Sequence, residues 1–288
     1  MSDILQTAKI SSHGPELQNA QSQMHGRKGV CCLAVAQNVP KDQQERISAK
    51  PPKILIESFL RRPSLKDEAM NGIASLIQDG IMVEQTANYR VEASLGAMMF
   101  IGDRYRVARA GDIVVLHFVD GMLLNPEELD APADRPPFGT EDYECMEVSE
   151  LAEFGNGENT FLFCTRSFAA VMTEELLEDT LQRSVYTVDE KHGVVSYDCT
   201  RWLKMLRDIF EESNSGMEYA VMANSIPPKK KRPGSKKVVI WVIVAVVAVI
   251  VAFLLLGALR RGPGSAQSGP PGGPGQTPPG VSETIPSD

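Results

Sequence analysis

The sequence predicts a layered α+β domain followed by one C-terminal transmembrane helix. Three observations lead to this. Strand-like apolar runs occupy the middle of the chain, helical patterns come in one block before them and one block after them, and a long uninterrupted apolar segment lies near the C-terminus. Helices grouped in blocks around a run of strands are typical of layered α+β domains rather than of alternating parallel sheets.

The first elements are one strand and two helical segments. Residues 29–37, GVCCLAVAQ, form the first clear strand pattern, and residues 43–60 are helical in character but interrupted by Pro51 and Pro52. Ser64 then offers a hydroxyl that could cap a second helix. We expect the buried stripe of that helix to comprise Leu65, Ala69, Ile73, Leu76 and Ile77.

The middle of the chain reads as strands joined by tight turns. Three apolar segments between residues 92 and 124 are separated by Gly102-Asp103 and Gly111-Asp112, with a further turn at Asp120-Gly121. Gly-Asp and Asp-Gly pairs between apolar runs are hairpin signals. The pattern therefore predicts an antiparallel meander, which a proline-rich and acidic loop at residues 125–144 follows.

A second block of elements follows this loop. Residues 161–164, FLFC, form a run without polar alternation, which indicates a strand buried on both faces. Thr173, followed by Glu174 and Glu175, marks a helix start, because the hydroxyl can cap free amides and the carboxylates favour the positive end of the helix dipole. The last strand is expected within residues 218–226. Before it comes a helix with an apolar stripe of Trp202, Leu203, Leu206, Ile209 and Phe210.

The segment 238–259 predicts a membrane span. Its 22 residues contain no charged side chain, and at about 1.5 Å per residue they would extend roughly 33 Å as a helix. Six basic residues precede the segment at 229–237 and two follow it, so the positive-inside tendency places the N-terminal side in the cytoplasm and the tail outside or in a lumen. A bacterial inner membrane is the preferred location, with a eukaryotic tail-anchored protein as the alternative.

The chain thus divides into four predicted parts. Residues 1–228 form a cytoplasmic domain, 229–237 a basic juxtamembrane segment, 238–259 the transmembrane helix, and 260–288 a tail rich in proline and glycine that we expect to be disordered. The N-terminal residues contain no apolar stretch of the kind found in signal peptides, so we expect none.

The charge of the predicted domain argues against a nucleic-acid partner. Of the 29 basic and 37 acidic residues, eight and two lie from residue 229 onward, which leaves 21 and 35 and a formal charge of −14 for the domain. Five cysteines without zinc-ligand spacing are interpreted as reduced core residues. They are Cys31, Cys32, Cys145, Cys164 and Cys199.

Five local sequences resemble, in order, the motifs of the metal-dependent type 2C (PPM) serine/threonine protein phosphatases. VARAGDIVVLHFVDGML, residues 107–123, is similar to the GDSR hairpin of that family, and TFLFCTRSFAAVMTEELLEDTL to its LLcSDGL segment. GPELQNAQSQ, LAVAQNVPKD and FEESNSGMEYAVMA resemble the NED, DGMGG and DN motifs. The resemblance covers most of residues 13–224 and implies an antiparallel β-sandwich flanked by helices, in α-β-β-α layers.

The resemblance also implies a metal site that this sequence has lost. In the family, aspartates from these motifs hold divalent metals that activate a water molecule. Here the four corresponding positions are Gln21, Gln37, Arg166 and Gly216. A guanidinium at the third position would repel another cation at about 4 Å by roughly 4 kcal/mol per unit charge at an effective dielectric of 20. We therefore expect no metal cofactor, with Mn or Mg only in the alternative of an active enzyme.

The remaining charged residues and the histidines give less specific indications of function. Arg166, with Lys41 or Arg27 assisting, is a candidate for contacting a phosphate group. Asp112 and Asp103 are explained by turn chemistry alone. The four histidines, His13, His25, His117 and His192, are scattered and receive no role.

Three functions are consistent with these residues. The first is a membrane-anchored pseudophosphatase, an inactive single-pass signalling scaffold that binds a protein partner such as a phosphoprotein or a kinase. The second is an active phosphatase whose metal ligands come from the acidic loop, for example Asp130, Asp134, Glu141 and Asp142. The third is a structural component of a membrane complex in which the exposed tail makes the specific contact.

Overall fold

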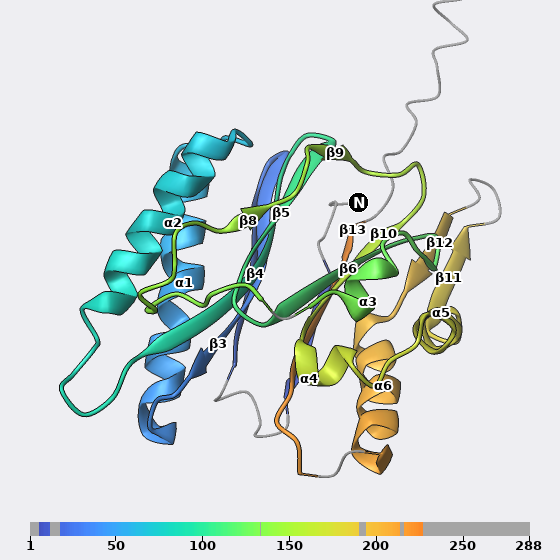
Figure 1. The fold of residues 1–288 in the computed structure, drawn as a ribbon. Coiled ribbons are helices and arrows are strands. Elements are labelled where there is room, and N and C mark those ends of the chain that lie inside the picture. The colour runs from blue at the N-terminus through green and yellow to red at the C-terminus, as the bar shows by residue number, and fades with distance from the viewer. Residues whose placement is uncertain (1–5, 12–17, 133, 190–193, 214–215, 227–288) are drawn as a thin grey trace, which may run out of the picture. The chain divides into compact units, whose positions relative to one another are not determined.

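The computed structural model describes residues 6–11, 18–132, 134–189, 194–213 and 216–226, which belong to one compact unit. Two antiparallel sheets pack against each other, and helices cover their outer faces (Figure 1). The first sheet has the strand order β1-β13-β10-β6-β7, and the second has the order β2-β3-β4-β5-β8, with β9 also paired to β5. The predicted antiparallel sandwich flanked by helices is confirmed.

The elements have the following bounds. The helices are α1 (Lys41–Arg61), α2 (Asp67–Met82), α3 (Glu127–Asp130), α4 (Arg166–Ala169), α5 (Glu174–Gln182) and α6 (Cys199–Ser213). The longer strands are β1 (Gln6–Ser11), β2 (Gln18–His25), β3 (Lys28–Gln37), β4 (Glu92–Ile101), β5 (Arg104–Ala110), β6 (Ile113–Val119), β10 (Asn159–Thr165) and β13 (Ala220–Ile226). The shorter strands are β7 (Met122–Leu123), β8 (Glu147–Val148), β9 (Ala152–Glu153), β11 (Val185–Asp189) and β12 (Val194–Tyr197).

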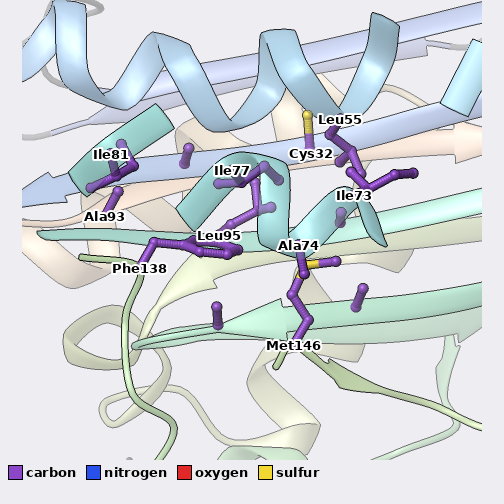
Figure 2. Close-up of a cluster of buried hydrophobic side chains, with 14 of the residues drawn as sticks. Cys32, Leu55, Ile73, Ala74, Ile77, Ile81, Ala93, Leu95, Phe138 and Met146 are labelled. Carbon is purple, nitrogen blue, oxygen red and sulfur yellow. The ribbon is translucent and has the colours of Figure 1, made fainter. Parts of the chain in front are cut away.

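Three apolar cores hold the layers together. One lies between the second sheet and helices α1 and α2, where Ile77 of α2 lies over Leu95 of β4 and Leu55 of α1 lies beside Cys32 of β3 (Figure 2). A second lies between the two sheets, and a third lies between the first sheet and helices α4 to α6. All buried members of the three cores come from residues 8–223, so the unit closes its cores without the rest of the chain.

The strands β5 and β6 do not pair, which corrects the predicted meander. β5 pairs with β4 in the second sheet, whereas β6 pairs with β10 in the first, so the chain changes sheets at the Gly111-Asp112 turn. The sheets approach closely here, because a Cβ atom on Gly96 would lie only 2.4 Å from Cγ2 of Ile113. A Gly-Asp pair between apolar runs indicates a turn, but it does not reveal that the next strand joins another sheet.

Polar contacts also join the two sheets. Their donors and acceptors are buried or half-buried, where a hydrogen bond matters because an unpaired polar group would be costly. The contacts are Ser22 Oγ to Asn224 Oδ1 at 2.7 Å, Asp112 N to Ser94 Oγ at 3.1 Å, and Tyr105 Oη to His117 Nδ1 at 2.9 Å.

His117 is the centre of a buried network that sequence analysis missed. Its ring stacks on Phe161 with centroids 4.3 Å apart, and its Nε2 lies 3.0 Å from Asn159 Oδ1. The amide nitrogen of Asn159 donates to two backbone carbonyls, so Oδ1 is an acceptor and His117 Nε2 carries the proton. Nδ1 then accepts the hydroxyl proton of Tyr105, and the neutral imidazole satisfies both neighbours.

Helix α1 continues through Pro51 and Pro52, where the sequence predicted an interruption. A proline inside a helix costs about 3 kcal/mol because it removes a hydrogen bond and crowds the preceding turn. Burial offsets this cost, since Ile47, Leu55 and Phe59 on the same helix are completely buried. Tertiary packing therefore overrides the local signal.

The other helix predictions are confirmed in part. Thr173 caps α5 by accepting a hydrogen bond from the Leu176 amide at 3.3 Å, as expected. Ser64 does not cap α2, which begins at Asp67 after Lys66. The buried face of α2 also differs from the predicted stripe: Leu76 is 54% exposed, and the buried side chains are Met70, Ile73, Ala74, Ile77 and Ile81.

Several elements and one cysteine depart from the sequence-based expectation. The strands β1 and β2 carry too many polar residues to have been identified from apolar runs, and the hairpin β11–β12, although rich in valine and tyrosine, was not predicted either. All five cysteines are free, and four of them are buried, but Cys145 is exposed and is not a core residue.

The predicted basic segment 229–237, membrane span 238–259 and tail 260–288 lie outside the described residues. Within the described part of the chain, no helix combines the length and apolar character needed to cross a membrane.

The His117 network makes stability sensitive to acid. Burial lowers the pKa of His117 from 6.5 to about 4. The unfolded chain takes up a proton between these values and the folded chain does not, so stability should fall as the pH falls from 6.5 towards 4, by up to about 3 kcal/mol. Urea unfolding of wild type and His117→Gln between pH 7 and 4 tests this. An equally steep decline in both proteins would contradict the assignment.

Candidate functional site at the Arg166 end of the sandwich

Three of the four positions that the sequence resemblance aligns with the family's aspartates lie at one end of the sandwich. Gln37 is the last residue of β3, Arg166 follows β10, and Gly216 precedes β13. Two hydrogen bonds bring the last two segments together: Thr165 Oγ1 accepts from the Ala220 amide at 3.3 Å, and Ser167 Oγ donates to the Glu218 carbonyl at 2.8 Å.

Gln21 does not join this end. It pairs with Cys32, five residues before Gln37 on β3, which corresponds to about 16 Å along the strand. Its Nε2 donates to Asn19 Oδ1 at 2.7 Å, on the face of β2 opposite to that of Ala20, which packs between the sheets. The structure therefore does not bring Gln21 to the end where Gln37 and Arg166 lie, and a polar strand gives no apolar alternation from which its register could have been predicted.

Arg166 is tied into the protein rather than extended into solvent. Its backbone amide donates to the Asp112 carbonyl at 3.1 Å, and its Nη1 donates to the carbonyl oxygen of Glu128 at 3.1 Å, with the Leu129 carbonyl at 3.5 Å. Its Nε lies 3.6 Å from Asp112 Oδ1. The guanidinium thus connects the end of β10, the sheet-crossing turn and the short helix α3.

A second group of charged residues, Arg109 and Arg135 with Glu128 and Glu147, also holds α3 in place. Arg109 of β5 has a side chain only 8% exposed and pairs with both Glu128 and Glu147. Arg135 also contacts both of these carboxylates. Sequence reasoning missed this network, although a charged residue between the buried Ala108 and Ala110 was a usable signal.

The electrostatics of the site follow from burial and from these cations. Burial is the largest influence on Asp112 and raises the pKa of its carboxyl, while Arg166 and Arg135 oppose that rise. Asp112 therefore serves as the counter-charge of Arg166. Cation binding requires several convergent oxygen donors without a competing positive charge, and this donor set does not fit a divalent metal.

The acidic loop does not gather its carboxylates either. Glu141 pairs with Arg90 at 2.8 Å, and Asp130 is exposed at the end of α3. Asp134 and Asp142 line a shallow pocket of about 420 Å³, which they share with Arg135, Pro136, Pro137 and Thr140. Among the described residues, no three histidine, cysteine, aspartate or glutamate side chains are grouped as a metal site would require.

The structure separates one of the two predicted assisting cations, Arg27, from Arg166. Arg27 is exposed in the β2–β3 turn at the far end of β3 from Gln37, so it cannot assist Arg166. Lys41 is the first residue of α1. The Arg166 side chain is only 14% exposed, and its Nε and Nη2 atoms are buried. A phosphate group therefore has no direct access to these two nitrogen atoms.

Comparison with known structures identifies the fold. The serine/threonine phosphatase of S. agalactiae aligns with a TM-score of 0.59 and 10% identity over 78% of this chain and 100% of its own. The Mycobacterium tuberculosis phosphatase PstP aligns at 0.54, with 14% identity, over 77% and 99%. MsPP, a PPM phosphatase from Mycobacterium smegmatis in complex with cacodylate, aligns at 0.52, with 16% identity, over 77% and 99%.

The chain therefore has the fold of the PPM-type phosphatases, as the order of its motifs predicted. A structure of the PstP catalytic domain, which aligns at 0.54 with 16% identity over 77% of this chain and 98% of its own, holds two manganese ions. No protein-family model and no curated protein matches the sequence. At identities of 10–16%, the structural likeness identifies the fold and leaves the chemistry to the residues of this chain.

Removing the Arg166 side chain should destabilise the domain. Arg166→Met leaves two carbonyl groups and the half-buried Asp112 carboxylate without their cation, at a cost of about 2 kcal/mol. The matched control is Arg183→Met, because Arg183 forms an exposed pair with Asp179 that should contribute less than about 0.5 kcal/mol. Urea unfolding gives the free energy of unfolding of wild type and of both variants. Equally small losses of this free energy in the two variants would show that Arg166 is merely a surface charge.

Proposed function

We propose that this protein is a membrane-anchored pseudophosphatase, a catalytically inactive PPM-like domain that binds a protein partner in signalling. The observation that carries the proposal is the position of Arg166. In the resemblance to PPM phosphatases, this residue replaces a metal-binding aspartate, and in the structure its guanidinium lies beside Asp112 and bonds to α3. A fixed internal cation takes the position of a metal ligand.

The proposal also depends on what the other positions offer. Gln37 and Gly216 provide no carboxylate at this end of the sandwich, and Asp112 is committed to Arg166. Activation of water at neutral pH by a PPM-type site needs a bound metal that lowers the pKa of that water. The residues gathered here favour an ion pair between Arg166 and Asp112 and a hydrogen bond from Arg166 to α3. They do not favour the binding of a metal that could activate water.

Membrane anchorage is supported by the sequence of residues 238–259. A charge-free apolar stretch of 22 residues with six basic residues before it has the composition of a single transmembrane helix whose N-terminal side is cytoplasmic. In this arrangement the domain faces the cytoplasm, with a bacterial inner membrane as the preferred location. The domain would hold its partner, such as a phosphoprotein or a kinase, at the membrane surface.

Metal binding and turnover give the direct test of inactivity. Titration of manganese and magnesium into the full chain in detergent should give no heat of binding above the buffer, and a generic phosphomonoester should not be hydrolysed. PstP, whose catalytic domain has been seen with two manganese ions, is the positive control in the same detergent. Micromolar metal binding with turnover would reject the proposal and favour an active enzyme with displaced ligands.

The location of the partner site separates a scaffold domain from a structural component that acts through its tail. Deletion of residues 262–288 leaves the predicted anchor and its flanking arginines in place. Chemical crosslinking in the membrane, followed by mass spectrometry, should recover the same partner from the full chain and from the shortened chain. Loss of the partner on deletion would transfer the binding function from the domain to the tail.

A further inference from the structure

The end of the domain opposite to Arg166 carries a concentration of basic residues. The segments 25–28, 61–68 and 102–106 contain seven lysines and arginines and three acidic residues, and the nearby Glu153 adds a fourth acid. These segments and Glu153 together carry a formal charge of +3, on a domain whose overall formal charge is −14. We call this surface the basic end. Its cations are Arg27, Lys28, Arg61, Arg62, Lys66, Arg104 and Arg106.

Hydrogen bonds and ion pairs place these segments side by side. The Gly102 amide donates to the Arg27 carbonyl at 2.6 Å, which joins the β2–β3 turn to the β4–β5 turn. Lys28 Nζ donates to the Leu60 carbonyl at 3.1 Å, at the end of α1, and Arg106 pairs with Asp67 in the first turn of α2. Two hairpin turns and two helix ends therefore form one continuous surface.

Several of these cations are available to a ligand. Arg104 and Arg106 are paired with Glu153 and Asp67. In contrast, within the part of the chain that the structure describes, four side chains of the basic end are exposed and form no ion pair. They are Arg27, Arg61, Arg62 and Lys66.

The chain leaves the described unit at this same end. Ile226, the last residue of β13, pairs with Asn159, which also pairs with Val119 of β6. Ile226 packs against the inter-sheet core that contains Phe100 and Tyr105, which pair with each other one residue inside the β4–β5 turn. In Figure 1, the α1–α2 connection and the β4–β5 connection lie together towards the top of the view.

We propose that the basic end binds the anionic headgroups of a lipid bilayer. Only the 11 residues 227–237 separate Ile226 from the predicted membrane span, and they can extend at most about 40 Å. The basic end is therefore the part of the domain nearest along the chain to the bilayer. Lysine and arginine side chains within a Debye length of an anionic surface are attracted to it, whereas the acidic remainder of the domain lies too far away to be repelled strongly.

This inference extends the proposed function, because it assigns an orientation to an anchored domain. The segment 229–237 adds six further basic residues between the basic end and the predicted span. An anchored domain held by its basic end would turn the Arg166 end, with the acidic loop, away from the lipid and towards soluble proteins.

Vesicle binding by the shortened chain 1–226 tests the basic end without the anchor or the basic segment. The three cores close within residues 8–223, so this chain retains the described fold, which circular dichroism should verify. It should sediment with vesicles of phosphatidylcholine and phosphatidylglycerol at 7:3 and 0.1 M salt, but not with pure phosphatidylcholine. Raising the salt to 0.5 M should release it, because screening shortens the range of the attraction.

Charge reversal localises the binding. The double variant Arg61→Glu/Arg62→Glu should weaken the partition into anionic vesicles at least tenfold, since each basic residue near such a surface contributes about fivefold. The matched control is Arg46→Glu/Arg90→Glu, which changes the net charge equally. Arg46 lies 15 residues before Arg61 on α1, which corresponds to about 22 Å, and we expect less than a twofold effect.

Two outcomes would overturn the inference. One is that the shortened chain does not sediment with anionic vesicles. This result would overturn the inference even if the same chain bound a soluble polyanion such as polyglutamate, because the ligand would then not be a lipid surface. The other is an equal loss of binding in the two double variants, which would indicate a response to net charge alone. Anchorage is decided separately by alkaline extraction of membranes that contain the full chain, so either proposal can fail while the other stands.

Discussion

The passage of the chain from one sheet to the other at Gly111-Asp112 is the constraint on which the site depends. Because β5 and β6 belong to different sheets, the turn between them must sit at the edge of both layers. Its backbone is held there from both sheets, by the Ser94 hydroxyl on one side and by the Arg166 amide on the other. The end of the sandwich is therefore rigid before any side chain at the site is considered. A charged side chain that contacts Asp112, such as Arg166, is therefore held in a fixed position as well.

Arg166 uses this rigid position to do structurally what a metal does in a carboxylate cluster. A divalent ion neutralises several convergent carboxylates and orders the loops that carry them. Here one guanidinium neutralises one carboxylate and orders α3 through its carbonyl groups. The guanidinium cannot be deprotonated in a protein, so its positive charge is present at every pH at which the domain is folded. The neighbouring pairs of Arg109 and Arg135 with Glu128 and Glu147 extend the same principle along the segment.

Sequence reasoning succeeded where apolar pattern and capping chemistry act locally, and it failed where register or distant packing decides. The buried strand β10 and the Thr173 cap could each be predicted from a few neighbouring residues. The continuous helix through Pro51 was not, because burial of its neighbours against a distant sheet offsets the local cost. At the candidate site, Gln37 ends one apolar strand and Arg166 follows another, so both lie at the same end of the sandwich, whereas Gln21 lies within a polar strand that gives no apolar pattern from which to predict its register.

The two ends of the sandwich differ in how their charges are satisfied, and this difference bears on where a partner can bind. At the Arg166 end, the cations Arg109, Arg135 and Arg166 pair with carboxylates inside the protein, so they are not free to bind an anionic ligand. At the basic end, exposed arginines remain without such pairs among the described residues. Electrostatic attraction acts mainly within about 8–10 Å of a surface at physiological salt. An acidic domain with one basic end can therefore be attracted to an anionic surface in one orientation and repelled in the others, which would give orientation without a large contact area.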